Sequence, residues 1–293
     1  MAAELPEGEV IALERDSASI TLEPAGQLEL SGAPLETIHE TCAEFDGHLR
    51  ELHAISEELD IVWLSLGFHP FARHADLPHV PKQRYGIMEN VERGFVEEVR
   101  PVPWQTATGL GNWHYDRGLY ERHGYRSAEN VVQRLCDAVS KNGNLLLSVP
   151  MRGDGSIDED EEKILSDLAA WLAVHGEAIY GTRPWRRFGE GPTRPPEGHQ
   201  REGDAAPFTS RDIRFTTRDG ALNAFFLVRP DGESVVESLG TRRLPEARIE
   251  RIEQLGGGPI EFSRDEAGLR FTLPGPAHGA FVPAVRILGR GLL

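Results

Sequence analysis

Cysteine is scarce in this chain of 293 residues, which contains only Cys42 and Cys136. Two cysteines cannot build the disulfide framework of a small secreted scaffold. The sequence also lacks a CxxC motif and a histidine-rich tract, the usual signs of a zinc site. We therefore expect neither a disulfide-stapled fold nor a structural zinc.

Basic residues are in deficit, with 31 lysines and arginines against 47 acidic residues and a formal net charge of -16. Such a surface repels nucleic-acid phosphates and anionic lipids, so no nucleic acid and no membrane is expected as a partner. The sequence has no apolar run long enough to span a bilayer, and its start lacks the basic and apolar parts of a signal peptide. As written, the chain is expected to be cytoplasmic.

The residues that are present suit a folded protein, because 39% are hydrophobic and 27% are charged. Alternating apolar residues over 9–30, interrupted by the turn Pro24-Ala25-Gly26, predict a β-hairpin. Apolar residues at steps of three and four then predict an amphipathic helix over 34–59. The apolar run 61–68 predicts a buried strand.

Two carboxylates, Glu23 and Glu29, lie six residues apart across the hairpin turn. Both could project from one hairpin toward one point, and magnesium needs such oxygen ligands when it holds nucleotide phosphates. The same spacing also fits solvated surface carboxylates. Spacing alone leaves both interpretations open.

The string Leu22-Glu-Pro-Ala-Gly-Gln-Leu-Glu-Leu-Ser-Gly-Ala-Pro34, followed by Gly67-Phe68 and residues 81–88, resembles the plant- and proteobacterial-type glutamate–cysteine ligases. The resemblance covers roughly residues 5–90. Those enzymes use magnesium and ATP to activate the γ-carboxylate of glutamate for attack by cysteine. The resemblance implies Mg and ATP as cofactors, with Glu23 and Glu29 as metal- or nucleotide-site carboxylates. The site would be incomplete, because the regions that supply the family's other metal carboxylates and its substrate-binding arginines are absent.

From about residue 91 the pattern changes. Ser127 is a good N-cap for a helix that should end at Lys141-Asn142-Gly143, and a continuous apolar strand follows over 144–149. Asp158 and Glu161 have the spacing of a capping box at the start of another helix. A helix, a buried strand and a further helix are typical of part of a βα barrel.

Aromatic rings and polar donors gather between residues 104 and 115. Sugar sites combine flat aromatic faces with groups that hold hydroxyls. The candidate sugar-binding residues are Trp104, Gln105, Trp113, His114 and Tyr115. The alternative, in which the aromatic side chains only fill a core, stays open at this point.

Three segments, Pro103-Trp104-Gln105-Thr106, Gly111–Asp116 and Ser140–Pro150, are similar to the retaining α-L-fucosidases, as is Gly176–Trp185. This resemblance covers about residues 92–293. It implies a (β/α) barrel followed by a β-sandwich, no cofactor, and a fucosylated glycan or small fucoside as the substrate.

The C-terminal third has the signals of many short strands. Residues 189–207 are rich in proline and glycine and predict a linker. Strand patterns with intervening turns, among them Asp219-Gly220, predict an antiparallel β-sandwich over 208–293. The expected fold is mixed α+β, with a ligase-like α/β fragment at 1–90 and the end of a (β/α) barrel at 91–188.

Glu92 is the candidate general acid/base, although a plain surface carboxylate fits its sequence context equally. A retaining glycosidase needs two carboxyl groups about 5–5.5 Å apart. In the fucosidases the nucleophile is an aspartate on an earlier barrel strand, and ligase-like sequence stands in that place here. We therefore predict an inactive glycosidase fragment.

Two other functions stay open. The first is a carbohydrate-binding or interaction protein that uses the β-sandwich with Trp104, Trp113 and Tyr115. The second is a ligase remnant that binds Mg-ATP. We interpret the change of resemblance between Met88 and Glu92 as a gene fusion or an assembly artefact.

Overall fold

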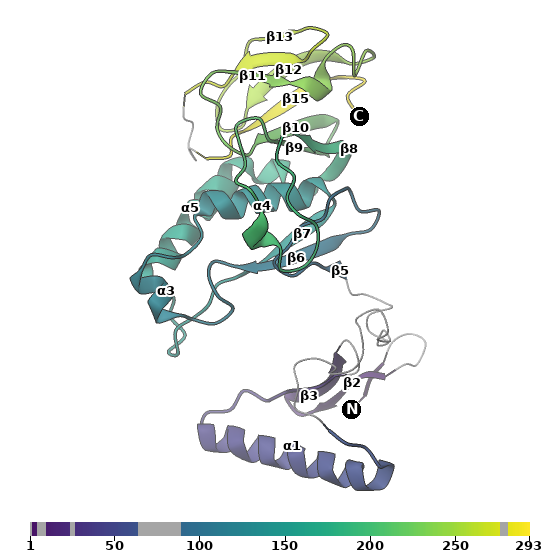
Figure 1. The fold of residues 1–293 in the computed structure, drawn as a ribbon, viewed down its shortest axis with the longest axis vertical. Coiled ribbons are helices and arrows are strands. Elements are labelled where there is room, and N and C mark those ends of the chain that lie inside the picture. The colour runs from purple at the N-terminus through teal and green to yellow at the C-terminus, as the bar shows by residue number, and fades with distance from the viewer. Residues whose placement is uncertain (1, 5–9, 24–26, 64–88, 276–280) are drawn as a thin grey trace. The chain divides into compact units, whose positions relative to one another are not determined.

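The computed structural model describes residues 2–4, 10–23, 27–63, 89–275 and 281–293. The chain divides into two compact units, Met1–Ile87 and Met88–Leu293 (Figure 1). Both units combine helix with β-sheet, so the mixed class expected from the sequence is present. None of the helices in the described ranges is both long enough and apolar enough to cross a membrane.

The first unit contains a four-stranded antiparallel sheet and one long helix. The strands follow the order of the chain: β1 (Ala2–Glu4), β2 (Val10–Arg15), β3 (Ala18–Glu23) and β4 (Gln27–Ser31). The strands predicted over 9–30 are therefore present as three antiparallel neighbours rather than as a single hairpin.

Helix α1 spans Ile38–Leu59 and begins later than the predicted residue 34, because Thr37 caps it. The Thr37 hydroxyl accepts the Glu40 N–H at 3.3 Å, and the Glu40 carboxylate accepts the Thr37 N–H at 2.9 Å. This reciprocal pair is a capping box. The strand predicted over 61–68 is not formed at 61–63, and its remainder lies outside the described residues.

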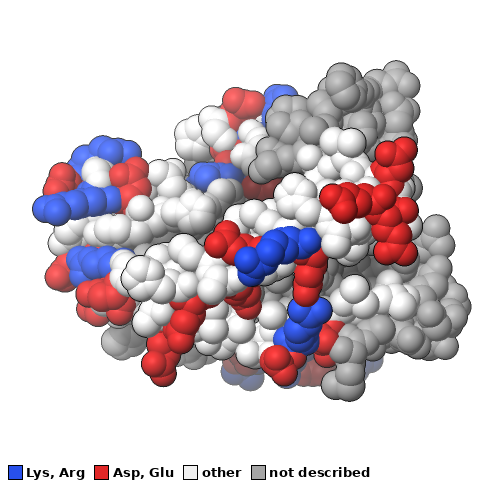
Figure 2. All heavy atoms as spheres, turned by 90° about the horizontal axis from the view of Figure 1, so that it is seen from below, with Lys and Arg blue, Asp and Glu red and all other residues white. Residues whose placement is uncertain are grey.

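The apolar stripe of α1 is largely uncovered. No residue of the helix is buried, and Phe45 and Leu59 are 55% and 60% exposed. Figure 2 shows uncharged surface lying between acidic and basic side chains. A helix with an apolar stripe normally buries it against a core.

The second unit begins with a three-stranded parallel sheet in the order β5 (Glu89–Asn90), β6 (Trp104–Gly109) and β7 (Gly143–Ser148). The helices of this unit are α3 (Arg117–Glu121), α4 (Ala128–Ser140) and α5 (Glu159–His175). Ser127 caps α4 and Lys141 is its C-cap, as predicted. The predicted capping box of Asp158 and Glu161 opens α5.

Two antiparallel sheets follow. The five-stranded sheet has the order β12 (Arg248–Gln254), β15 (Ala284–Arg290), β10 (Ala221–Phe226), β9 (Ile213–Arg218) and β8 (Arg183–Glu190). The three-stranded sheet has the order β11 (Glu233–Val236), β14 (Leu269–Thr272) and β13 (Phe262–Arg264). Asp219 and Gly220 both have positive φ, which suits the predicted hairpin turn between β9 and β10.

Strand β10 lies at the centre of the packing, and all six of its residues are buried. Phe226 meets Phe271 of β14 edge to face, with ring centroids 5.8 Å apart. Its neighbour Phe225 points to the opposite face and lies 6.2 Å from the ring of Trp171 in α5. The five-stranded sheet is therefore covered on one face by the smaller sheet and on the other by helices (Figure 1).

A buried ion cluster ties α4 to β9. Asp137 accepts from Arg214 Nε at 2.7 Å and from Lys141 Nζ at 2.9 Å, and all three side chains are at most 2% exposed. Lys141 Nζ also donates to the Val96 carbonyl at 2.9 Å and lies 4.6 Å from the ring centroid of Phe188 in β8. Burial alone would raise the pKa of Asp137, but the charges of Lys141 and Arg214 outweigh it and lower that pKa.

We predict that Asp137→Asn lowers the free energy of unfolding by about 3–5 kcal/mol, because two cations would remain buried beside a neutral amide. Asp167→Asn is the matched control, since Asp167 pairs with Lys163 at the same helical spacing but stays 42% exposed. The control should cost less than about 1 kcal/mol. Urea unfolding followed by tryptophan fluorescence measures both, and equal losses would contradict the assigned role of the cluster.

Candidate active site

One face of the parallel sheet bears polar side chains. The ladder aligns Asn90 with Gln105, and Gln105 in turn with Asn144. The Gln105 amide lies 3.4 Å from the Asn90 side-chain oxygen, so the two side chains share a face. Leu146, two residues beyond Asn144, is 54% exposed on the same face. In a closed barrel this face would point into the interior.

Glu92 continues β5 on this face. The Val91 and Arg93 N–H groups donate to the Gln105 and Ala107 carbonyls at 2.8 and 2.7 Å, which extends the ladder past Asn90. By alternation, Glu92 shares the side of Asn90.

Two residues far along the chain hold Glu92. The Gln200 side-chain amide donates to Glu92 Oε1 at 3.0 Å, and the Gln200 N–H donates to the Glu92 carbonyl at 2.8 Å. The Glu92 N–H donates to His199 Nδ1 at 3.2 Å, which requires that nitrogen to be unprotonated. The candidate acid/base is thus fixed at its backbone and at one carboxylate oxygen.

Glu202 anchors the segment that carries His199 and Gln200. Its carboxylate accepts from Arg93 Nε at 2.6 Å, from Thr108 Oγ1 at 2.8 Å and from Arg134 at 3.0 Å, and it also pairs with Arg126. Burial disfavours the charged form of Glu202, but the charge of Arg134 and the hydrogen bonds from Thr108 and Arg93 prevail and lower its pKa. Burial, followed by the charge of Arg126, lowers the pKa of Arg134 to about 10.

Sequence reasoning missed His199, Gln200 and Glu202. The region 189–207 was predicted as a linker from its proline and glycine content, whereas its first two residues end β8 and Glu202 has a side chain only 6% exposed. The one available signal is the isolated cluster of charged residues that follows Pro195 and Pro196. The partners of that cluster are distant in the sequence, so the pattern alone could not reveal the contacts.

Trp104 is placed in a core rather than at an open surface. It is 1% exposed and packs with Val91, Val96 and Ala138. Its indole N–H donates to the Lys141 carbonyl at 3.0 Å. Gly143 makes room for the ring, since a Cβ there would lie 2.5 Å from a ring carbon. The buried ring of Trp104 is not available to stack on a sugar, whereas its sequence motif predicted a sugar-binding role.

The remaining aromatic candidates do not form one platform. Trp113 is 37% exposed, and the Arg93 guanidinium lies 5.7 Å from its ring centroid. Trp113 therefore contacts the residue that follows Glu92. Tyr115 instead contacts Arg152, whose Nε donates to the Tyr115 hydroxyl at 3.4 Å. His114 is exposed and has no hydrogen-bond partner within the described ranges.

In the first unit, the two candidate metal ligands occupy neighbouring positions of the β3–β4 backbone ladder. In the β3–β4 ladder Glu23 is opposite Gln27 and Glu29 is opposite Thr21, so the two glutamates are diagonal neighbours. The side chain of Glu23 lies outside the described residues, and Glu29 is exposed. Among the described residues no group of three His, Cys, Asp or Glu side chains could hold a metal ion.

Two family sequence profiles match this chain. The Alpha-L-fucosidase profile matches residues 71–177, and the profile of Glutamate-cysteine ligase family 2 matches residues 6–117. The chain joins sequence from two enzyme families. The two matches overlap at 71–117, a stretch that contains the join predicted between Met88 and Glu92.

The ligase-like region is similar to plant glutamate–cysteine ligases. It is 53% identical over 81 residues to the chloroplastic glutamate–cysteine ligase of Brassica juncea, a match that covers 28% of this chain and 16% of that protein. The chloroplastic glutamate–cysteine ligase A of Oryza sativa subsp. japonica is 52% identical over 84 residues, or 29% of this chain and 17% of that protein.

The fucosidase-like region is similar to solved structures. One α-L-fucosidase is 28% identical with a TM-score of 0.54, covering 69% of this chain and 42% of that one. The Thermotoga maritima α-fucosidase, solved in complex with fucose, is 28% identical with a TM-score of 0.50 and covers 64% and 41%. This chain spans about two fifths of these fucosidases and about a sixth of the ligases.

We predict that Glu202→Gln destabilises the fucosidase-like region by roughly 1–3 kcal/mol at neutral pH, because three arginines lose a charged acceptor. Since the pKa of Glu202 is lowered in the folded state, its contribution is present above the ordinary glutamate range and is lost as pH falls through the lowered value. The difference between wild type and variant should therefore shrink in acid.

The control for this prediction is Asp204→Asn, because Asp204 pairs with Arg201 while 61% exposed. Denaturant unfolding at several pH values gives both differences. A pH-independent gap between wild type and Glu202→Gln would show that the carboxylate charge is not what stabilises the segment.

Proposed function

We propose that this chain is a fragment of an α-L-fucosidase fused to a fragment of a glutamate–cysteine ligase, and that it does not hydrolyse fucosides. Within this proposal, the three parallel strands with α4 and α5 are the end of a (β/α) barrel. The two antiparallel sheets are the β-sandwich that follows the barrel in the fucosidase family. The similarity to solved fucosidases over about two thirds of the chain supports both assignments.

The observation that carries the proposal is the solitary position of Glu92. Cleavage with retention needs a nucleophilic carboxylate and an acid/base about 5–5.5 Å apart. By the ladder, the described residues that share the open face of β5–β7 with Glu92 include Asn90, Gln105, Ala107, Asn144 and Leu146, and none of these is a carboxylate. Glu202 contacts β6 only from the opposite face, through Thr108, and that hydroxyl and three arginines occupy its oxygens. A carboxylate stabilised in that way is a weak nucleophile.

We expect no release of the aryl group from an aryl α-L-fucoside above the buffer rate, and the same result for Glu92→Gln, because covalent attack on the anomeric carbon has no nucleophile. A 2-fluoro-fucosyl fluoride, which traps glycosyl-enzymes, should add no mass to the protein. Turnover that disappears in Glu92→Gln, or a stoichiometric adduct on an Asp or Glu, would contradict inactivity.

A second function, sugar binding without hydrolysis, is favoured by the half-exposed ring of Trp113 beside Arg93. The aromatic ring offers an apolar face and the guanidinium a hydrogen-bond donor. Fucose binding that is lost in Trp113→Ala, in the absence of turnover, would favour this function over a fully inert fragment.

The residues of the ligase-like region do not complete a magnesium site. The resemblance offers only Glu23 and Glu29 as ligands, whereas a magnesium ion bound with ATP needs an octahedral set of oxygen ligands. We therefore expect Mg and ATP to leave the unfolding temperature unchanged. A rise that depends on both additions and is absent in Glu29→Gln would instead favour an Mg-ATP-binding remnant.

A further inference from the structure

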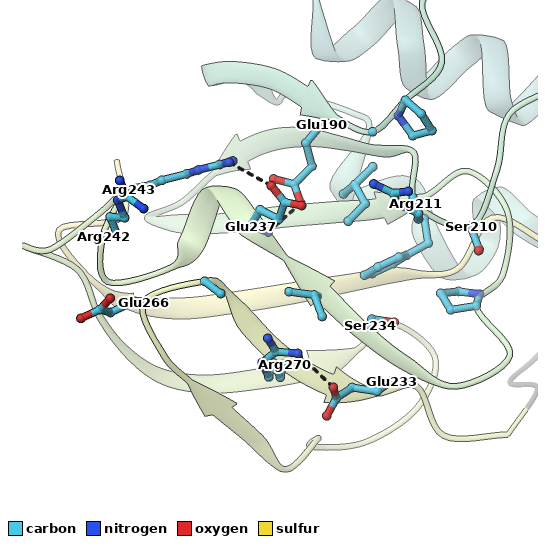
Figure 3. A pocket seen from close by; sticks show the side chains of 17 residues that line it. Glu190, Ser210, Arg211, Glu233, Ser234, Glu237, Arg242, Arg243, Glu266 and Arg270 are labelled. Carbon is cyan, nitrogen blue, oxygen red and sulfur yellow. Dashed lines mark hydrogen bonds and ion pairs between the residues drawn. The ribbon is translucent and has the colours of Figure 1, made fainter.

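Strand β7 lies at the edge of the parallel sheet and contains no charged residue (Figure 1). Natural sheets keep their edges from pairing with another chain by short strands, bulges or charged side chains. Among the described residues, every other edge strand carries at least one charged residue, namely β1, β4, β5, β8, β11, β12 and β13. Glu233 of β11, in the wall of the pocket that Figure 3 shows, pairs with Arg270 at 3.1 Å. Strand β7 lacks protection of this kind.

The backbone groups of Leu145 and Leu147 face the open edge of β7. The Ser148 carbonyl accepts the Leu110 N–H at 3.0 Å, so the backbone groups of Ser148 point toward the side of β6. Because successive residues of a strand point these groups to opposite sides, those of Leu145 and Leu147 point away from β6. On that side they form no backbone hydrogen bond with any residue the structure describes. An added strand would therefore find two donors and two acceptors there.

Both faces of β7 offer apolar surface to an added strand. On one face, Leu146 is 54% exposed. On the other face, Leu145 and Leu147 are half-buried and line a groove of about 1050 Å³ together with Leu135 of α4 and Leu172 of α5. An added strand with apolar side chains would bury this surface, which favours pairing beyond the backbone hydrogen bonds.

The strand is complementary to itself. When two copies of β7 pair antiparallel about Leu146, Leu145 of one copy lies opposite Leu147 of the other, and the edge-facing backbone groups of both exchange hydrogen bonds. Asn144 then lies opposite Ser148. The two Leu146 residues form a pair without backbone hydrogen bonds, with Cα atoms about 4.5 Å apart and side chains in contact. In a chain with a net charge of -16, this uncharged strand lets two copies approach without a charge at the contact.

The opposite edge of the same sheet is already occupied by the chain itself. The N–H groups of Gln200 and Glu202 donate to the Glu92 and Arg93 carbonyls at 2.8 and 3.0 Å. In the part of the chain that the structure describes, each copy therefore offers one open edge of this sheet. Symmetric pairing through β7 uses that edge in both copies, so the assembly closes at two chains instead of growing into a fibre.

We propose that β7 pairs antiparallel with β7 of a second copy of this chain, centred on Leu146, and that the two parallel sheets become one continuous sheet in a dimer. This inference goes beyond the proposed function, because it concerns assembly and requires neither sugar binding nor catalysis.

Light scattering of the full chain after size exclusion should give twice the 32.5 kDa of one chain, and the dimer should dissociate on dilution. Leu146→Lys should raise the dissociation constant about tenfold or more, because two like charges would lie directly opposite each other. Phe45→Lys is the matched control, since Phe45 is 55% exposed on α1 and undergoes the same change of charge. It should leave the dimer intact. A monomeric wild type throughout the micromolar range, or a dimer that persists in Leu146→Lys, overturns the proposal.

A mixture of two variants tests the register. Leu146→Lys and Leu146→Glu should each be monomeric alone, whereas an equal mixture should form dimers, because residue 146 lies opposite itself and opposite charges would then meet. Unfolding curves confirm that each variant is folded. A mixture that stays monomeric overturns the proposed register, and loss of the dimer in Phe45→Lys as well as in both Leu146 variants, without recovery on mixing, overturns the β7 contact.

Hydrogen exchange of the wild-type chain tests the pairing without a substitution. The amides of Leu145 and Leu147 should exchange more slowly as the protein concentration rises, because they donate hydrogen bonds only in the dimer. The Leu146 amide is the internal reference, since it faces β6 within its own chain and should exchange slowly at every concentration. Exchange of the Leu145 and Leu147 amides that does not depend on concentration overturns the proposal.

Discussion

The buried contact between Asp137, Lys141 and Arg214 holds the fucosidase-like region together. It joins the end of α4 to strand β9 of the five-stranded sheet, and Lys141 extends it to Val96 and to the ring of Phe188. The Lys141 carbonyl also receives the indole of Trp104. The cluster therefore links several elements of the described chain. Removing one partner of a buried ion pair strongly destabilises the fold.

This arrangement explains how the three-stranded parallel sheet is held against the five-stranded antiparallel sheet. The helix-covered face of β5–β7 is supported by α4, which the ion cluster fixes to β9. On the other face Leu146 is 54% exposed. The proposed lack of activity follows from the same asymmetry, because a retaining site needs a second carboxylate from strands on that side.

The sequence predicted elements whose signals are local. The bounds of α4 followed from Ser127 and Lys141, and the β9–β10 hairpin followed from Asp219-Gly220, because caps and tight turns depend on a few adjacent residues. The resemblance to two enzyme families was also readable from short motifs, since 81 residues sufficed for a match at 53% identity.

What the sequence could not reveal depends on distant contacts. The residues 189–207 have the composition of a linker, yet Glu202 is buried because Arg93, Arg126 and Arg134 converge on it from other elements. Trp104 has the motif of a sugar-binding residue, but the missing Cβ of Gly143 lets its ring pack inward. Strand β8 was not predicted as a strand, and its residues were assigned to the barrel end and the linker. Its pairing with β9 has no signal in the local sequence.

Amide hydrogen exchange of the full chain tests most directly whether the fucosidase-like region is an independently stable fold. The account predicts that amides of α4 and β9 exchange slowly, through global unfolding of that region, while amides of the uncovered α1 exchange much faster. If α4 and β9 exchanged as fast as α1, the fucosidase-like region would not be an independently stable fold, and the account would be wrong.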